Sequence, residues 1–341
     1  VITAAMGHAL AKRLADKKVA LSTSEDLVGM IWEDRPSLSA QPAFLLDEKY
    51  AGKSSSQKLA ELREKMKDNG CTIHVITTLD DIAWLFNIRG NDVEYNPVVL
   101  SYAVIGMEQA HLFANPVCLN DEIREKLSAD GVKIHDYDEM ISFVKGLSAD
   151  EAVLLDPQKV NYAIDSSIQG KKVEKANPTQ LAKAIKNPVE LENIRNAHIK
   201  DGVAFTKFMY WLKTNVGKIP MTEISAADYL LACRAEQEGF IEPSFDTISA
   251  YKANAAMMHY SATKESDAVL QAEGMLLVDS GGQYYEGTTD ITRTMVLGPI
   301  TDEQKLHFTT VLRSNLNLAN ARFLHGCVGM NLDILARGPI W

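Results

Sequence analysis

Residues 276–294, LLVDSGGQYYEGTTDITRT, place two carboxylates where a strand, a turn and a second strand are expected. Asp279 follows an apolar run, and Asp290 lies on the returning segment. An ionised carboxylate is costly to bury alone. In an antiparallel hairpin with an even-numbered loop, two residues at an odd separation can lie opposite each other on one face. We therefore expect Asp279 and Asp290 to face each other and to be neutralised, either by the chain or by a shared cation.

Three arrangements satisfy this requirement. The two carboxylates can share a divalent cation, or one of them can be protonated beside the other. In the third arrangement Asp279 caps the turn at residues 280–282, and Asp290 forms an ion pair with Arg293. Two carboxylates about 4 Å apart repel by roughly 1–4 kcal/mol in a watery or surface dielectric, so a bare ionised pair is disfavoured.

The elements that must position these acids begin with a helix over 186–217. Asn187 can cap this helix, Pro188 suits its first position, and Glu190 completes a capping-box-like pattern. Apolar residues then recur at spacings of three and four, which is typical of a helix with one buried face. A second helix is predicted from Thr222 to Gly239, and strand-like segments follow. Two helices followed by antiparallel strands indicate an α+β layer.

The preceding region, residues 43 to 182, alternates between strand-like and helical segments. A helix over 54–70 begins with serine caps and ends on Gly70. The other predicted elements are strands over 71–78, 96–106, 110–114, 132–137 and 152–156, and helices over 120–131 and 137–147. This alternation predicts an α/β domain with a mixed or parallel sheet.

We expect three parts along the chain. Residues 1–40 are interpreted as the tail of a first N-terminal domain with a linker, 41–182 as a second N-terminal α/β domain, and 183–341 as the first part of a catalytic domain. The chain begins at Val1 and stops at Trp341 without a polar tail, so we expect it to be an internal portion of a longer protein.

Composition narrows the class of protein. A net charge of −10 over 341 residues disfavours nucleic acid as the main partner, because phosphate binding needs a basic surface. The four cysteines lie far apart and form no C-x-x-C pair, which is typical of a reducing compartment. The longest apolar run, residues 98–107, is too short to cross a bilayer. A soluble, cytoplasmic protein is predicted.

The aspartate segment resembles the first metal-ligand segment of the pita-bread metallopeptidases, which include methionine aminopeptidase, prolidase and aminopeptidase P. In that family the two aspartates of a D-x10-D stretch bind a pair of divalent metal ions. The resemblance implies that Asp279 and Asp290 are metal ligands, with Mn²⁺ the expected ion and Co²⁺ or Zn²⁺ left open. It also implies a pita-bread α+β domain behind the α/β region.

Other segments extend the resemblance along nearly the whole chain. The segment PSFDTISAYKANAAMMHYSA is similar to the family stretch that ends in a His-Tyr pair, and His259 matches its active-site histidine. NPVELENIRNAHIKDGVAF resembles the family's opening helix. LDDIAWLFNIRGNDVEYNPV and DLVGMIWEDRP resemble the second domain and a domain junction of the three-domain Xaa-Pro aminopeptidases.

The resemblance assigns roles to further residues and also leaves gaps. Arg293 is expected to be structural, pairing with a buried carboxylate near the site. Trp84 and Arg89 are expected in strands or turns, where they could bind substrate in a neighbouring subunit's site. The family's third ligand, a histidine, and two later glutamates would lie beyond Trp341. The segment shown is therefore expected to be inactive by itself.

The implied activity is metal-dependent removal of an N-terminal residue that precedes proline, by a cytosolic homodimer acting on proline-containing peptides. Prolidase, which cuts dipeptides only, is the first alternative, and the long region ahead of Lys186 favours the larger aminopeptidase. A non-catalytic pita-bread module that binds peptides or proteins is the second. Retention of both Asp279 and Asp290 argues against that module and against a metal-free creatinase-type hydrolase.

Overall fold

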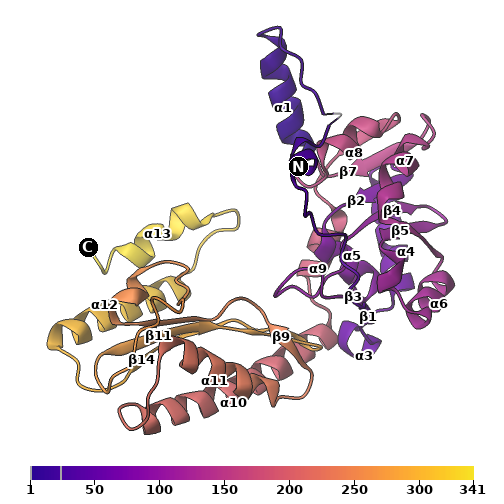
Figure 1. Ribbon diagram of the computed structural model, residues 1–341. Helices are drawn as coiled ribbons and strands as arrows, with labels where there is room; N and C mark the ends of the chain where they lie inside the picture. Colours follow the sequence, from indigo (N-terminus) through magenta and orange to yellow (C-terminus); the bar gives the residue numbers. More distant parts are fainter. Residues whose placement is uncertain (1, 24) are drawn as a thin grey trace. The chain divides into compact units, whose positions relative to one another are not determined.

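A computed structural model of the chain describes residues 2–23 and 25–341, which form two compact units (Figure 1). The N-terminal unit contains the chain up to Lys200 together with residues 238–245 and 282–289. The C-terminal unit contains residues 201–237, 246–281 and 290–341. No helix in the described ranges combines the length and apolar character that a membrane span requires.

A six-stranded mixed sheet forms the centre of the N-terminal unit, with strand order β6-β5-β4-β2-β7-β8 (Figure 1). Strands β5 and β6, β2 and β7, and β7 and β8 pair in parallel, whereas β4 pairs antiparallel with both β2 and β5. The mixed sheet predicted for this region is confirmed. The strands are β2 (Ile73–Ile76), β4 (Ser101–Gly106), β5 (Ala110–Ala114), β6 (Val132–Asp136), β7 (Ala152–Leu155) and β8 (Lys171–Glu174).

Helices cover both faces of this sheet, because successive strand residues point to opposite sides. Ile76 packs into a core cluster with α4 (Ser55–Asp68), α5 (Leu79–Phe86) and α6 (Asp121–Ala129). Its neighbour Val75 packs into a second cluster with α1 (Ala4–Ala15), α7 (Met140–Lys145) and α8 (Tyr162–Ser167). The result is a three-layer α/β unit, in agreement with the predicted class.

Local sequence signals explain most of these helices. Ser54 and Gln57 form the capping box that starts α4, and Gly70 beyond its end has φ 64°, as the serine and glycine signals predicted. Helix α5 was not predicted, and the expectation of strand or turn for Trp84 is wrong. Acidic residues occupy the first turn of α5, and Asn87 ends it at φ 53°, so the sequence does carry start and stop signals.

Shorter elements complete the N-terminal unit. Strand β3 (Ile88–Arg89) pairs with β1 (Phe44–Leu45), and β12 (Gly282–Tyr284) pairs with both β9 (Phe240–Pro243) and β13 (Gly287–Thr288). Helix α1 contacts α8 through His8, whose Nε2 lies within hydrogen-bond distance, 2.7 Å, of the fully buried carboxylate of Asp165. The remaining elements are α2 (Leu27–Ile31), α3 (Glu48–Ala51), η1 (Pro116–Cys118), η2 (Tyr137–Glu139) and α9 (Pro178–Ala184).

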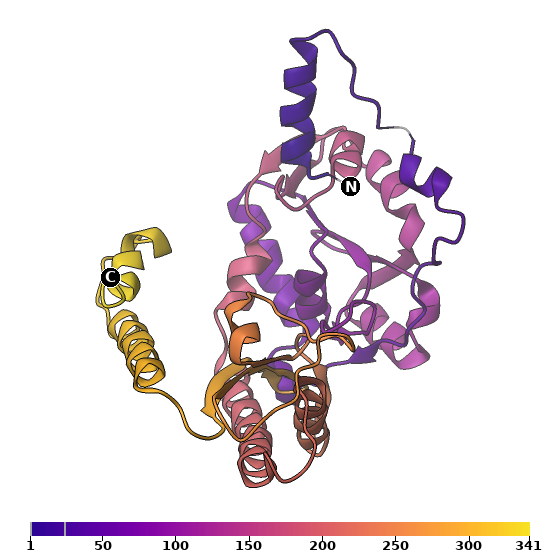
Figure 2. The same cartoon turned by 60° about the vertical axis from the view of Figure 1, so that its left-hand side comes forward.

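The C-terminal unit packs helices against a three-stranded antiparallel sheet of order β10-β11-β14. Its elements are the later part of α10 (Pro188–Asn215), α11 (Glu223–Ala235), β10 (Ile248–Tyr251), η3 (Lys252–Ala256), β11 (Met275–Ser280), β14 (Ile291–Val296), α12 (Asp302–Ala319) and α13 (Gly329–Arg337). Phe208 and Leu230 from the helices meet Leu276 and Val278 of β11 in one core. Helix α13 lies against α12 (Figure 2). The predicted α+β layer is confirmed.

The opening helix α10 starts as its sequence predicts. The Asn187 backbone N–H donates to Glu190 Oε2, and the Glu190 N–H donates to Asn187 Oδ1, both at 2.9 Å. Pro188 is the first helical residue. Helix α11 ends at Ala235 rather than at Gly239, which has φ 79° and lies in the connection to β9.

Candidate active site

The two aspartates lie at the end of one strand and at the approach to its neighbour. Asp279 belongs to β11, and Asp290 immediately precedes β14. The register pairs Asp279 with Thr292 and Ser280 with Ile291, so Asp290 is not directly opposite Asp279. The predicted opposition is wrong because the intervening residues do not form a simple loop. They include β12 and β13, which belong to another sheet, where β12 pairs with both β13 and β9.

The two carboxylates nevertheless meet. Asp290 is two positions before Thr292, so it lies diagonally from Asp279 on the same face of the strand pair. Partial desolvation, the negative charge of Asp279 and a hydrogen bond to Asp279 together raise the pKa of Asp290. Thr292 Oγ1 donates to Asp279 Oδ1 at 2.7 Å. The pair is therefore held at close range, where either a shared proton or a cation relieves the repulsion.

The arrangement with a capped turn and an ion pair is not the one formed. The Arg293 guanidinium is exposed and donates to the Thr292 carbonyl at 2.8 Å. Within the described ranges no carboxylate forms an ion pair with Arg293, neither Asp290 nor the buried acid expected for it. Arg293 pairs across the sheet with Val278, so its side chain starts from the face opposite Asp290.

The donor set suits a divalent cation in part. Asp279 and Asp290 offer carboxylate oxygens, the ligands that hard ions such as Mn²⁺ and Mg²⁺ prefer. Among the described residues, no group of three or more His, Cys, Asp or Glu side chains is placed to hold a metal ion. The chain therefore supplies two ligand groups, and a dinuclear centre would need others.

His259 lies on the segment between β10 and β11, in the same unit as the aspartates. Its side chain is exposed and its backbone φ is +54°, a left-handed conformation that is uncommon for residues other than glycine. The next residue, Tyr260, is buried. The turn thus presents the imidazole to solvent while it anchors the neighbouring ring inside.

A buried ion pair supports the strand that carries Asp279. Arg234 of α11 donates from Nε to Asp201 Oδ1 at 2.6 Å and from Nη2 to Asp201 Oδ2 at 3.2 Å. The same Nη2 donates to Ser280 Oγ at 3.0 Å, one residue beyond Asp279. His198, about one turn earlier on α10, donates from Nδ1 to the Ile194 carbonyl instead of to Asp201. The signal for Asp201 was its position on the apolar stripe of α10, where an acid needs a buried partner.

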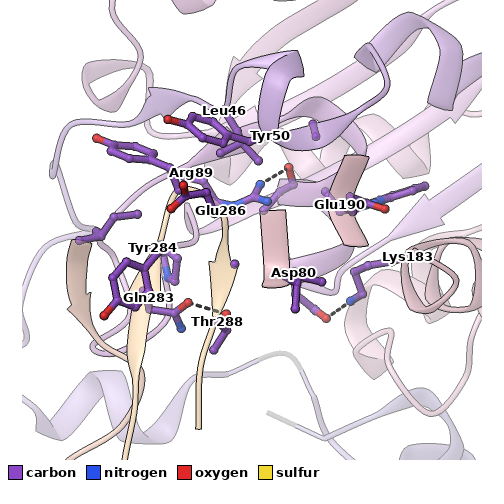
Figure 3. A pocket seen from close by; sticks show the side chains of 18 of the residues that line it. Leu46, Tyr50, Asp80, Arg89, Lys183, Glu190, Gln283, Tyr284, Glu286 and Thr288 are labelled. Atoms are coloured by element: carbon purple, nitrogen blue, oxygen red, sulfur yellow. Dashed lines mark hydrogen bonds and ion pairs between the residues drawn. The ribbon is translucent and has the colours of Figure 1, made fainter. Parts of the chain in front are cut away.

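The residues expected to bind substrate line a pocket within the N-terminal unit (Figure 3). It has a volume of about 430 Å³, and Trp84, Arg89 and Glu190 are part of its wall. The hairpin formed by β12 and β13 contributes Gln283 and Thr288, which are hydrogen-bonded to each other at 2.6 Å (Figure 3).

The charges in this pocket are strongly desolvated. Burial lowers the pKa of Arg89 to about 10, and Glu190 opposes this shift. Arg89 Nη1 donates to the carbonyls of Ala83 and Ile88 at 2.8 and 3.0 Å. Lys58 Nζ lies 4.6 Å from the centre of the Trp84 ring, and burial lowers the pKa of Lys58 to about 8. Trp84 Nε1 is buried and has no hydrogen-bond partner among the described residues.

Comparisons with known families agree with this architecture. Residues 34–190 match the Creatinase/Prolidase N-terminal domain, and residues 192–341 match Metallopeptidase family M24. The chain belongs to the M24 metallopeptidases of the pita-bread fold, with a creatinase-type domain ahead of the M24 domain.

Relatives within the family carry the name Xaa-Pro aminopeptidase. Xaa-Pro aminopeptidase app-1 of Caenorhabditis elegans is 39% identical over 332 residues, covering 94% of this chain and 54% of the relative. Aminopeptidase P1 of Arabidopsis thaliana is 35% identical and covers 94% of this chain and 57% of its own length. The chain thus spans about half the length of the curated relatives it matches.

A solved structure supports the same comparison. The X-prolyl aminopeptidase of Caenorhabditis elegans, described as a cytosolic enzyme with a di-nuclear active site, superposes with a TM-score of 0.93 at 36% identity. It covers 100% of this chain, which corresponds to 57% of the solved one. Prolidase from Pyrococcus horikoshii OT3 matches with a TM-score of 0.62 at 20% identity over 83% of this chain and 77% of its own, a likeness of fold alone.

Proposed function

We propose that the complete protein is a metal-dependent Xaa-Pro aminopeptidase, which removes the N-terminal residue of a peptide whose second residue is proline. The contact between Asp279 and Asp290 carries this proposal, because the raised pKa of Asp290 marks a repulsion that a bound cation relieves. A relative named Xaa-Pro aminopeptidase, 39% identical to this chain, supports the substrate class.

In this proposal Asp279 and Asp290 hold two divalent cations, most suitably Mn²⁺ given their oxygen donors. Divalent cations held there would supply Lewis-acid chemistry, which would polarise the scissile carbonyl and lower the pKa of the attacking water. His259 donates a hydrogen bond to the substrate or to the developing oxyanion, a role that an exposed imidazole on a defined turn can fill. A dinuclear centre needs ligands in addition to these two carboxylates.

The other assignments remain proposals. We propose that Arg89 and Trp84 bind substrate, which is supported by the pocket that both residues line and by the Trp84 Nε1–H, which has no hydrogen-bond partner among the described residues. We also propose that the protein forms a homodimer and that it works in the cytoplasm; the relative from Caenorhabditis elegans, described as cytosolic, supports the second of these. We propose that the chain has three parts, residues 1–40, 41–182 and 183–341. The family matches at 34–190 and 192–341 support a junction between the second and third parts, close to residue 190.

Replacing one aspartate of the complete protein tests the proposal. Asp290→Asn should lower kcat/KM for an Xaa-Pro-Pro tripeptide by at least about a thousandfold, because the metals are needed for water activation. Asp302→Asn, which changes an exposed carboxylate on α12, serves as the matched control and should keep activity within about twofold. Full activity in Asp290→Asn would contradict the assignment.

The same assay separates the aminopeptidase from its alternatives. An Xaa-Pro aminopeptidase cleaves the Xaa-Pro-Pro tripeptide, whereas a strict dipeptidase cleaves Xaa-Pro and leaves the tripeptide intact. A non-catalytic binding module cleaves neither substrate at any Mn²⁺ concentration. Cleavage of the dipeptide alone would replace the aminopeptidase assignment with prolidase.

A further inference from the structure

One buried carboxylate in the C-terminal unit, that of Glu223, accepts hydrogen bonds from four different donors. Glu223, the first residue of α11, is fully buried. Its Oε1 accepts from the Tyr251 backbone N–H at 2.6 Å and from Asn254 Nδ2 at 3.0 Å. Its Oε2 accepts from the Tyr260 hydroxyl at 2.7 Å and from the Ala268 backbone N–H at 3.2 Å. None of the catalytic or metal-binding roles proposed above involves Glu223.

All four donors belong to one stretch of chain. Tyr251 ends β10, Ala268 approaches the return to β11, and Asn254 and Tyr260 lie between them. Between η3 and β11 this stretch contains no strand or helix, so side-chain anchors have to define its path. A buried carboxylate is tolerated only when its oxygens are fully hydrogen-bonded, and Glu223 meets this condition entirely through the loop.

The anchor lies directly beside His259. Tyr260 is buried and donates to Glu223, whereas His259 is exposed and holds the left-handed backbone conformation at φ +54°. Such a conformation persists only when the surrounding contacts over-determine it. The Tyr260–Glu223 hydrogen bond and the Asn254 bond to the same carboxylate are the contacts on either side of the turn.

We propose that Glu223 is a positioning residue for His259. Through Tyr260 and Asn254 it fixes the turn that presents the imidazole, so that the histidine is held ready before substrate arrives. Preorganised hydrogen-bond donors stabilise a transition state without reorganisation, which is the benefit such an anchor gives. This inference rests on the proposed function only in assigning His259 a hydrogen bond in the reaction.

The test uses two variants of the complete protein. Tyr260→Phe deletes a single hydroxyl, and Glu223→Gln keeps the side-chain shape but removes the negative charge and replaces one acceptor oxygen with an NH2 donor. Thr263→Val is the matched control, because Thr263 is exposed in the same loop and its hydrogen bonds go to Ser266 and Glu265 rather than to Glu223. The readouts are amide hydrogen exchange over 252–268, the ring signals of His259 by NMR, and kcat and KM for an Xaa-Pro-Pro tripeptide.

We expect Tyr260→Phe to speed exchange over 252–268 by about tenfold and to lower kcat by about tenfold with KM within about twofold. Glu223→Gln should speed exchange and lower kcat by more than Tyr260→Phe does, whereas Thr263→Val should change neither exchange nor kcat. The His259 ring signals should move towards free-histidine values in the first two variants, while bound Mn²⁺ per chain stays at the wild-type ratio. A merely structural anchor would alter exchange without moving kcat.

Unchanged exchange, ring signals and kcat in Tyr260→Phe and Glu223→Gln would overturn the inference. Changed exchange with wild-type kcat would overturn it equally, because the anchor would then not serve the histidine. His259→Asn separates this from failure of the proposed function. Wild-type kcat in His259→Asn would show that this histidine has no catalytic role. A large loss of kcat in His259→Asn, with wild-type kcat in Tyr260→Phe and Glu223→Gln, would contradict only the positioning role of Glu223.

Discussion

Two consecutive residues of strand β11, Asp279 and Ser280, contact carboxylates in two different settings. Ser280 touches the buried pair of Arg234 and Asp201, in which the acid has a cation of its own. Its neighbour Asp279 touches Asp290, which is a second acid. The first arrangement is complete within the protein, whereas the second is left with a shared negative charge.

The difference separates acids that build the fold from acids that await a ligand. Asp201 is neutralised by Arg234, and Glu223 is satisfied by the donors of one loop. Asp279 and Asp290 have a threonine hydroxyl and each other, and the part of the chain that is described offers them no basic partner. A cation from outside the chain completes only the second arrangement, which is why the active site is proposed there.

The largest expected effect comes from breaking the completed pair. Arg234→Met should lower the free energy of unfolding of the C-terminal unit by about 3–5 kcal/mol, because it leaves the Asp201 charge buried without a partner. The double change Arg234→Met with Asp201→Leu should recover much of that loss. Urea unfolding followed by circular dichroism measures both.

The surface pair of Lys207 and Glu236 supplies the matched control, because it also joins α10 to the end of α11 but is exposed. Lys207→Met should leave the unfolding midpoint unchanged within error, since exposed ion pairs contribute little. A loss in Lys207→Met as large as that in Arg234→Met would mean that burial does not distinguish the two ion pairs.

A smaller effect is expected from a buried group that stays neutral. His74 is fully buried in β2, donates from Nδ1 to the Leu154 carbonyl at 3.0 Å and has no partner at Nε2 among the described residues. Burial lowers its pKa to about 4 from an ordinary 6.5. The unfolded chain therefore takes up the proton first, so stability is full above pH 6.5 and falls as the pH drops towards 4.

Between pH 7.5 and pH 5.0 this histidine should account for about 2 kcal/mol of lost stability. His74→Leu should reduce the pH-dependent loss by that amount, whatever its effect at pH 7.5. His307→Leu, at an exposed position of α12, should leave the pH dependence unchanged. Equal pH dependence in wild type and His74→Leu would show that His74 is not held neutral by burial.

Much of the fold could be predicted from the sequence where local signals agree. The capped helix α4 and the alternating strands of the N-terminal unit follow from periodicity and turn residues. Helix α5 was missed because its eight residues make only about two turns, too few for the apolar spacing to distinguish a helix from a strand. The acidic first turn and Asn87 nevertheless mark its ends. Trp84 consequently lies on a helix rather than on a strand.

The candidate site was predictable in its residue types but not in its geometry. The spacing of Asp279 and Asp290 indicated a close pair, whereas their diagonal register depends on the excursion through β12 and β13, which pair in another sheet. Arg234 and Glu223 carry no local signal of their roles, since their partners lie far away along the chain. Contacts between residues so far apart in the sequence can be identified only from the three-dimensional structure.

The most direct test of the central claim is calorimetric titration of Mn²⁺ into the metal-free complete protein. Wild type and Asp302→Asn should bind two ions per chain, and Asp279→Asn or Asp290→Asn should weaken at least one site by about a hundredfold or more. This loss should be confined to the two site variants. Wild-type Mn²⁺ binding in both Asp279→Asn and Asp290→Asn would show that the acid pair is not the metal centre.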